Sequence, residues 1–163
     1  MNALVVYDSV FSNTEKIAHA IGDALGSQED VRIVRARDVA PEQLEGLTLL
    51  VVGSPTRKFR PTGATIRLLR SIRKNGLEGV KVAAFDTRIL MEDVESSFAR
   101  AILGFFVSIF GYAAEPIADK LARKGGQATV PPAGFLVEDT EGPLKPGELE
   151  RAAEWALAVF AVA

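Results

Sequence analysis

Hydroxyl and amide side chains gather near the start of the chain, in the stretch Ser9-Val10-Phe11-Ser12-Asn13-Thr14. The run before it, Ala3–Tyr7, carries no charge and is typical of a strand buried on both faces. After it, Ile17, Ile21 and Leu25 recur at helical spacing. A turn from a buried strand into a helix presents unpaired backbone N–H groups at the positive end of the helix dipole. The stretch therefore favours the binding of a phosphate.

A simpler interpretation of these residues is a capping box, with Ser12 as N-cap and Glu15 reaching back to it. Any strand-to-helix turn needs such a start. The cap does not account for the hydroxyls of Ser9 and Thr14 or for the amide of Asn13. We therefore favour the anion site over a plain cap.

Composition narrows the class of protein. The chain has 163 residues, of which 48% are apolar and 25% are charged, which is usual for a globular protein. We expect a single domain over residues 1–163. The net charge of −2 gives no case for nucleic-acid binding. There is no cysteine and one histidine, so thiolate chemistry is excluded and a metal site is not expected. The longest uncharged apolar segment, Ala101–Ala114, is too short to span a bilayer. With no signal-peptide pattern, we expect a cytoplasmic protein without a transmembrane segment.

Strand and helix patterns alternate along the chain. Strands are predicted at Ala3–Tyr7, Val31–Arg35, Leu47–Val52, Val80–Phe85 and, split by paired prolines, Gln127–Val130 with Phe135–Val137. Helices are predicted at Asn13–Leu25, Thr62–Lys74, Tyr112–Lys124 and Gly147–Val162, with a short turn at Pro41–Leu44. In the last helix a core stripe is predicted from Leu149, Ala152, Ala153, Ala156, Leu157 and Phe160.

The second strand alternates apolar and charged residues, which indicates an edge strand. Five strands joined by crossover helices predict an α/β fold, a three-layer doubly wound parallel sheet. An edge position for strand two gives the order 2-1-3-4-5. In such sheets ligands bind beyond the carboxyl ends of the strands, so the loops after strands one, three and four are the candidate site.

These three loops carry a family resemblance. The segment Tyr7–Ala18 resembles the flavodoxin phosphate loop, written T/S-x-T-G-x-T. Val52-Gly53-Ser54-Pro55-Thr56 resembles the family's second flavin loop, and Ala84-Phe85-Asp86-Thr87-Arg88 resembles the opening of its third. Each motif is weak alone, but three in the right order make a strong signal. The chain resembles the flavodoxin family over essentially its whole length.

The resemblance implies FMN as the cofactor. Ser9, Asn13 and Thr14 are expected to bind the FMN phosphate through side chains and backbone N–H groups. The same loop also contains Val10, Phe11 and Ser12. Ser54, Pro55 and Thr56, followed by Arg57, Lys58 and Phe59, are expected along the ribityl chain and the flavin ring. Asp86, Thr87 and Arg88 are expected to supply backbone donors to the pyrimidine edge.

Two positions depart from the family pattern. Phe11 stands where the family has its second Thr, and Ser12 stands at its Gly, a position that tolerates a positive φ. A position that in the family allows a positive φ or close approach of the phosphate therefore carries a side chain here; alternatively, Ser12 supplies an oxygen to the phosphate. No Tyr or Trp follows in the flavin loops. Phe59 is the candidate for one flavin face and an aliphatic residue from 89–91 for the other.

No acidic residue lies between Gly46 and Leu77, while Arg57, Lys58 and Arg60 precede the helix and are expected near the flavin. The later cations, from Arg67 onward, are interpreted as a solvated helix face. The cationic loop predicts a less negative flavin reduction potential than an acidic surround would give. It could also receive an acidic partner or a phosphorylated pyridine nucleotide.

The segment Ile89–Gly111 is long for a connection. Helical spacing within it, seen at Val94, Phe98, Ile102, Phe105 and Ile109, predicts a core helix, with a lid over the flavin or a subunit contact as alternatives.

Three function classes follow from these observations. The leading one is an FMN-binding redox protein that transfers electrons between a reductase and an acceptor, with redox proteins as partners. The second is an FMN-dependent enzyme such as a quinone reductase or a protoporphyrinogen oxidase-like protein, acting on a small quinone-like acceptor. The third is an FMN-free interaction module. The sequence leaves open whether the protein is a monomer or a homodimer.

Overall fold

The computed structural model describes residues 1–57, 60–90, 97–98, 100–101 and 112–161. Its elements run in the order β1 (Ala3–Tyr7), α1 (Asn13–Leu25), β2 (Val31–Arg35), η1 (Ala36–Asp38), η2 (Pro41–Leu44), β3 (Leu49–Pro55), α2 (Gly63–Ser71), β4 (Lys81–Arg88), α4 (Ala114–Arg123), β5 (Gln127–Ala128), β6 (Ala133–Leu136) and α5 (Glu148–Ala161), where η denotes a short 3-10 helix.

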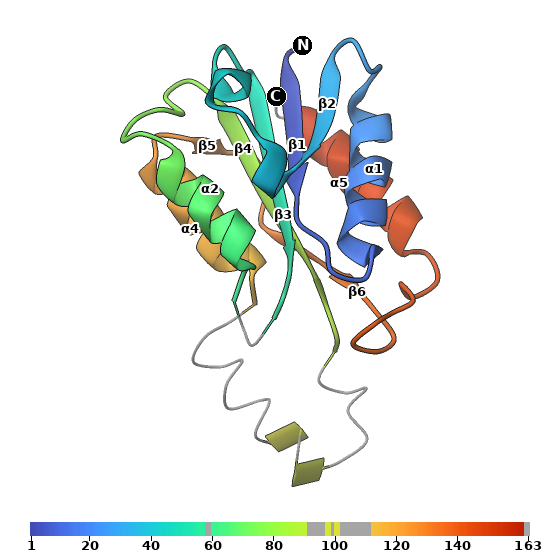
Figure 1. Cartoon of the computed structure of the whole chain (residues 1–163). Helices are drawn as coiled ribbons and strands as arrows, with labels where there is room; N and C mark the ends of the chain where they lie inside the picture. Colours follow the sequence, from blue (N-terminus) through green and yellow to red (C-terminus); the bar gives the residue numbers. More distant parts are fainter. Residues whose placement is uncertain (58–59, 91–96, 99, 102–111, 162–163) are drawn as a thin grey trace.

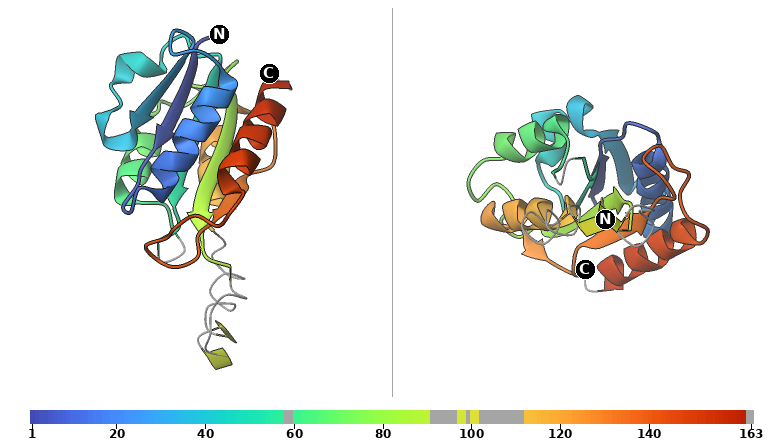
Figure 2. Two further views of the ribbon diagram at one scale, coloured as in Figure 1. Left: turned by 90° about the vertical axis from the view of Figure 1, so that its right-hand side faces the viewer. Right: turned by 90° about the horizontal axis from the view of Figure 1, so that it is seen from below.

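The strands form one parallel sheet in the order β2-β1-β3-β4-β5. This confirms the predicted doubly wound order and the edge position of β2. Helices α1 and α5 cover one face of the sheet, and α2 and α4 cover the other (Figures 1 and 2). The fifth strand is split as predicted: β5 pairs with the start of β4, and β6 pairs with its end. Pro131 and Pro132 lie in the break because proline cannot donate to a ladder.

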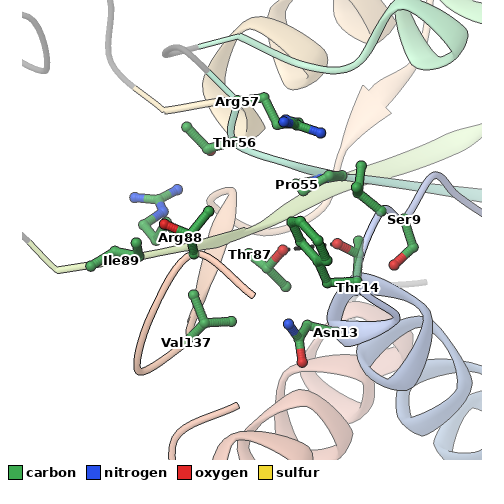
Figure 3. Close-up of a pocket in the computed structure, with 13 residues that line it drawn as sticks. Ser9, Asn13, Thr14, Pro55, Thr56, Arg57, Thr87, Arg88, Ile89 and Val137 are labelled. Carbon is green, nitrogen blue, oxygen red and sulfur yellow. Dashed lines mark hydrogen bonds between the residues drawn. The ribbon is translucent and has the colours of Figure 1, made fainter. Parts of the chain in front are cut away.

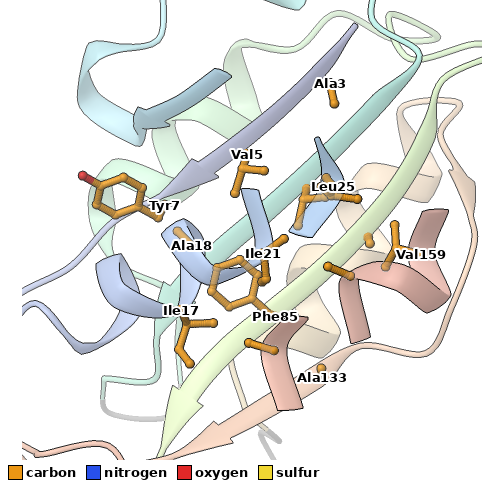
Figure 4. Close-up of a cluster of buried hydrophobic side chains, with 14 of the residues drawn as sticks. Ala3, Val5, Tyr7, Ile17, Ala18, Ile21, Leu25, Phe85, Ala133 and Val159 are labelled. Atoms are coloured by element: carbon orange, nitrogen blue, oxygen red, sulfur yellow. The ribbon is translucent and has the colours of Figure 1, made fainter. Parts of the chain in front are cut away.

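Two apolar clusters hold the layers together. Ala3, Val5 and Tyr7 of β1 face α1 and α5 (Figure 4), whereas Leu4 and Val6 face α2 and α4. Because both faces of the strand are covered, every residue of β1 is buried. This is why the strand reads as a continuous apolar run.

Strands β3 and β4 extend past their predicted ends at Val52 and Phe85. Ser54 pairs with Asp86 and Pro55 pairs with Thr87 across the two strands. The extension follows from pairing on both sides, since β6 continues the ladder on the other edge of β4. Polar residues expected in loops therefore lie in strands at the carboxyl edge of the sheet.

The stripe predicted for α5 is wrong in part. Leu149, Leu157 and Phe160 are exposed, by 42%, 56% and 50%. The helix packs through the fully buried Ala152, Ala156 and Val159 instead. The apolar positions of α5 span more than one face, and the small side chains select the face that lies against its neighbours.

Most of the segment Ile89–Gly111, for which a core helix is predicted, lies outside the described residues.

Candidate functional site

A cavity of about 260 Å³ lies at the carboxyl edge of the sheet (Figure 3). The ends of β3 and β4, the start of α1 and the loops that follow β1, β3, β4 and β6 contribute to it. It is lined by Ser9, Val10, Phe11, Asn13, Thr14, Pro55, Thr56, Arg57, Thr87, Arg88, Ile89, Val137 and Thr140. The cavity thus occupies the position that the doubly wound order predicts for a ligand.

The capping box, which was the simpler alternative for the start of α1, is not formed. Ser12 has φ 63° and ψ 0°, in the left-handed region, and its side chain makes no capping hydrogen bond. The Glu15 carboxylate accepts a hydrogen bond from the Tyr7 hydroxyl at 2.8 Å instead. A side-chain cap needs an extended backbone at the N-cap residue, which the left-handed conformation excludes. Ser12 therefore preserves the backbone conformation that glycine adopts readily.

The loop from Ser9 to Ser12 has donors without acceptors. The buried Ser9 hydroxyl has no hydrogen-bond partner among the described residues. Within the same part of the chain, no acceptor pairs with the backbone N–H groups of residues 9–12. A buried hydroxyl such as that of Ser9 is nearly always paired in folded proteins, whereas Val10, Phe11 and Ser12 are exposed. Together these donors can bind an acceptor-rich group at the N-terminus of α1.

Two hydrogen bonds fix the far side of this loop. The hydroxyls of Thr14 and Thr87 lie 2.8 Å apart, which joins the start of α1 to the end of β4 (Figure 3). One hydroxyl of such a pair donates to the other, so the acceptor hydroxyl keeps its own proton for a ligand. The amide of Asn13 donates to the carbonyl of Glu141 at 3.0 Å. Both side chains are buried and held in place before any ligand arrives.

Arg35 holds the loop from the neighbouring strand, and sequence reasoning missed it. Its guanidinium donates to the Ser9 carbonyl, and its Nε lies 3.5 Å from the Asp8 carboxylate. Because β2 is adjacent to β1, the last residue of β2 reaches the loop that follows β1. The edge position of β2 was the signal that could have found it.

Asp86 and Arg88 form an ion pair beneath the site. The guanidinium donates to both carboxylate oxygens, at 2.6 and 2.7 Å, and lies over the Tyr112 ring. The carboxylate also accepts from the backbone N–H of Ala114 at 2.8 Å. Burial raises the pKa of Asp86, and the Arg88 and Ala114 hydrogen bonds partly offset that rise. The pair ties the end of β4 to the start of α4.

The structure brings together most of the residues predicted for the site. Ser9, Val10, Phe11, Asn13, Thr14, Pro55, Thr56, Arg57, Thr87 and Arg88 all line the cavity. Ser12, Ser54 and Asp86 do not; Ser54 accepts from the Thr62 N–H at 3.0 Å and so shapes the loop after β3. Lys58 and Phe59 lie outside the described residues.

Sequence reasoning missed the contribution of the loop after β6. Val137 and Thr140 line the cavity from that side. Figure 3 shows Val137 across the cavity from Ser9. Their signal was available, because the rule that ligands lie beyond carboxyl ends applies to this strand too. Ile89, one of the aliphatic residues considered for a flavin face, also lines the cavity.

A doubly wound parallel sheet with an anion-binding loop at its switch point defines a class of nucleotide- and flavin-binding proteins. The family model described as flavodoxin matches residues 5–155. The chain belongs to the flavodoxin family, whose cofactor is FMN, and is a flavodoxin-like redox protein. The unpaired donors of the first loop fit the phosphate of that cofactor.

Solved structures show the same fold. A flavodoxin from the domain Archaea is 24% identical with a TM-score of 0.71, and each chain is covered to 99%. Oxidised flavodoxin 1 from Bacillus cereus is 15% identical with a TM-score of 0.74, covering 99% of this chain and 98% of that one. Rubredoxin oxygen:oxidoreductase from Desulfovibrio gigas is 17% identical with a TM-score of 0.70; 99% of this chain matches 36% of that one. Comparison with curated protein sequences found no match. Among the described residues, no helix is both long and apolar enough to cross a bilayer.

Proposed function

We propose that this protein carries electrons between a reductase and an acceptor protein, with FMN bound in the cavity at the carboxyl edge of the sheet. The observation that carries the proposal is the buried, unpartnered Ser9 hydroxyl beside four backbone N–H groups that have no acceptor among the described residues. Bound FMN supplies one- and two-electron redox chemistry.

The chain's own residues bind and orient. Ser9, Asn13 and Thr14 hold the phosphate through hydroxyl, amide and backbone donors, so the phosphate needs no cation of its own. Thr87 keeps Thr14 in place from β4. Phe11 stands at the position where the family has its second Thr. Its ring lines the cavity, is 40% exposed and covers part of the flavin in this proposal. Pro55, Thr56 and Ile89 supply the opposite walls.

Fluorescence titration of FMN into the purified full-length protein tests the proposal. We expect saturable quenching at micromolar protein and weaker binding of riboflavin, which lacks the phosphate. Ser9→Ala should weaken FMN binding about tenfold or more, because it removes a hydrogen bond to a charged group, and should leave riboflavin binding nearly unchanged. Ser27→Ala, at an exposed serine outside the cavity, is the matched control. Equal affinity for FMN and riboflavin would contradict the assignment of this loop to the phosphate.

The second candidate is an FMN-dependent quinone reductase or a protoporphyrinogen oxidase-like enzyme. Ile89, Val137 and Phe11 give the cavity apolar walls, which suit a quinone-like ring. Steady-state oxidation of NADH or NADPH with a soluble quinone separates the two functions. A carrier turns over only when a reductase is added, whereas a quinone reductase turns over alone.

A further inference from the structure

A second cavity, of about 290 Å³, lies between α2 and α4, away from the phosphate loop. Pro61, Ile66, Leu69 and Pro116 form its apolar floor, and the basic side chains of Arg60, Arg70 and Lys120 surround it. We refer to these seven residues as the cationic groove. The two helices that form it lie side by side on one face of the sheet (Figures 1 and 2).

The cations of the groove have no acidic partner in the part of the chain that the structure describes. None of Arg60, Arg70 and Lys120 forms an ion pair with another described residue, and all three are exposed. All 21 acidic residues of the chain lie outside the stretch from Gly46 to Leu77, which supplies most of the groove. Asp119 and Glu115 of α4 are the nearest acids along the sequence; both are exposed, and Glu115 lies 3.8 Å from Arg88.

Helix α2 and the residues just after it carry further positive charge. Arg67, Arg73 and Lys74 are also exposed. A site for a single phosphate is built from converging donors such as bidentate arginines or backbone N–H groups. Here the charges surround an apolar floor instead. That pattern matches a protein surface with an apolar side chain at its centre and carboxylates around it.

The groove adjoins the flavin cavity through one short turn. Arg57 lines the flavin cavity and Arg60 lines the groove, and each donates its backbone N–H to the carbonyl of the other at 3.0 Å. A partner seated on the groove therefore lies next to the mouth of the flavin cavity.

We infer that the cationic groove is the docking surface for an acidic partner protein, which inserts an apolar side chain between α2 and α4. That this partner is an electron-transfer protein rests on the proposed function; the binding itself requires no flavin.

A fluorescently labelled peptide with one phenylalanine flanked by glutamates is the probe, titrated into the full-length protein and followed by anisotropy. We expect saturable binding that weakens about tenfold at high salt, because screening removes most attraction between exposed charges. The same peptide with serine in place of phenylalanine should bind more weakly. Chemical-shift changes in the isotope-labelled protein should map to α2 and α4.

Variants of exposed residues separate local recognition from net charge. Lys120→Gln should lower affinity about threefold, and Arg70→Gln with Lys120→Gln about tenfold, since each exposed pair contributes modestly. Ile66→Gln should remove the preference for phenylalanine over serine. Lys16→Gln, which removes the same charge from an exposed position in α1, is the matched control and should change little.

Three kinds of outcome would overturn the inference. The first is a failure of the peptide to bind specifically: either no binding at about 100 μM protein, or a loss of affinity in Lys16→Gln equal to that in Lys120→Gln. The second is tighter binding of 2′,5′-ADP at the same residues, which would identify a nucleotide site. The third is a homodimer that Ile66→Gln dissociates, which would identify a second copy as the occupant. FMN titration of the same protein is independent, so a failure of docking and a failure of the proposed function are distinguishable.

Discussion

Ser12 has an unfavourable backbone conformation in the loop assigned to the phosphate. Its φ of 63° places a side chain in the left-handed region, which costs a non-glycine residue about 1–2 kcal/mol. The side chain is exposed and makes no capping hydrogen bond, so among the described residues no side-chain cap offsets that cost. The strain is the local consequence of keeping a glycine-like turn with a serine.

Ser12→Gly should therefore stabilise the protein. Relief of the left-handed strain outweighs the greater freedom of glycine in the unfolded chain, for a net gain of up to about 1 kcal/mol in the free energy of unfolding. Ser12→Val should destabilise by about 1–2 kcal/mol, because a β-branched residue tolerates a positive φ least. Urea denaturation measures both. Indistinguishable midpoints for the glycine and valine variants would show that the turn relaxes without cost.

At the scale of the elements, the contact between β4 and β6 requires a residue without a side chain at Gly134. A Cβ added at Gly134 would lie 2.3 Å from Nε of Arg88 and 2.4 Å from its Cζ. Arg88 neutralises the wholly buried Asp86, whose carboxylate also holds the start of α4. The ladder between β4 and β6 and the buried ion pair are therefore one structural unit.

Gly134→Ala should displace Arg88 and lower the free energy of unfolding by about 3–5 kcal/mol, the cost of leaving a buried charge unpaired. Loss of the guanidinium raises the pKa of Asp86 further above its unfolded value. A carboxyl with a raised folded pKa contributes stability at low pH and loses it as pH rises through that pKa. The deficit should therefore be larger at pH 8 than at pH 5. Gly63→Ala, where the nearest atom is at 3.7 Å, is the control and should be neutral or stabilising. A pH-independent deficit would mean that Arg88 keeps its contact with Asp86.

The same elements show what could be predicted from sequence. Continuous apolar runs and one alternating strand were enough for the sheet order, because burial on both faces and an edge position leave different patterns. The ends of β3 and β4 could not be predicted in this way, since pairing between distant strands extends them. The residue type of Ser12 favours a helix cap, and only the family resemblance placed it at a position that tolerates a positive φ, because the left-handed turn is imposed by the tertiary setting. The role of Arg35 depends on which strands are neighbours, which emerges only with the topology.

Over the whole molecule, a net charge of −2 conceals a strong asymmetry. The face made by α2 and the preceding turn carries cations only, and the acidic residues lie elsewhere. Arg57 lies where this face meets the cavity at the carboxyl edge of the sheet, which we propose binds FMN. Such a field acts in two ways, by orienting a charged partner and by stabilising negative charge placed in the cavity.

If FMN binds in this cavity as proposed, the second effect should make its reduction potential less negative, and Arg57→Gln should reverse part of that shift. At an assumed separation of about 8 Å, one charge contributes roughly 0.5–2 kcal/mol between the dielectric constants of water and of a protein surface, or about 20–90 mV for one electron. We expect the potential of the variant to be more negative by an amount in this range, measured by spectroelectrochemical titration. The shift should shrink as ionic strength rises, because Arg57 is exposed and its field is screened. Lys74→Gln removes an equal charge beyond the end of α2, toward the opposite edge of the sheet, and should move the potential far less. Equal shifts in both variants would mean that net charge, and not the position of Arg57, sets the potential.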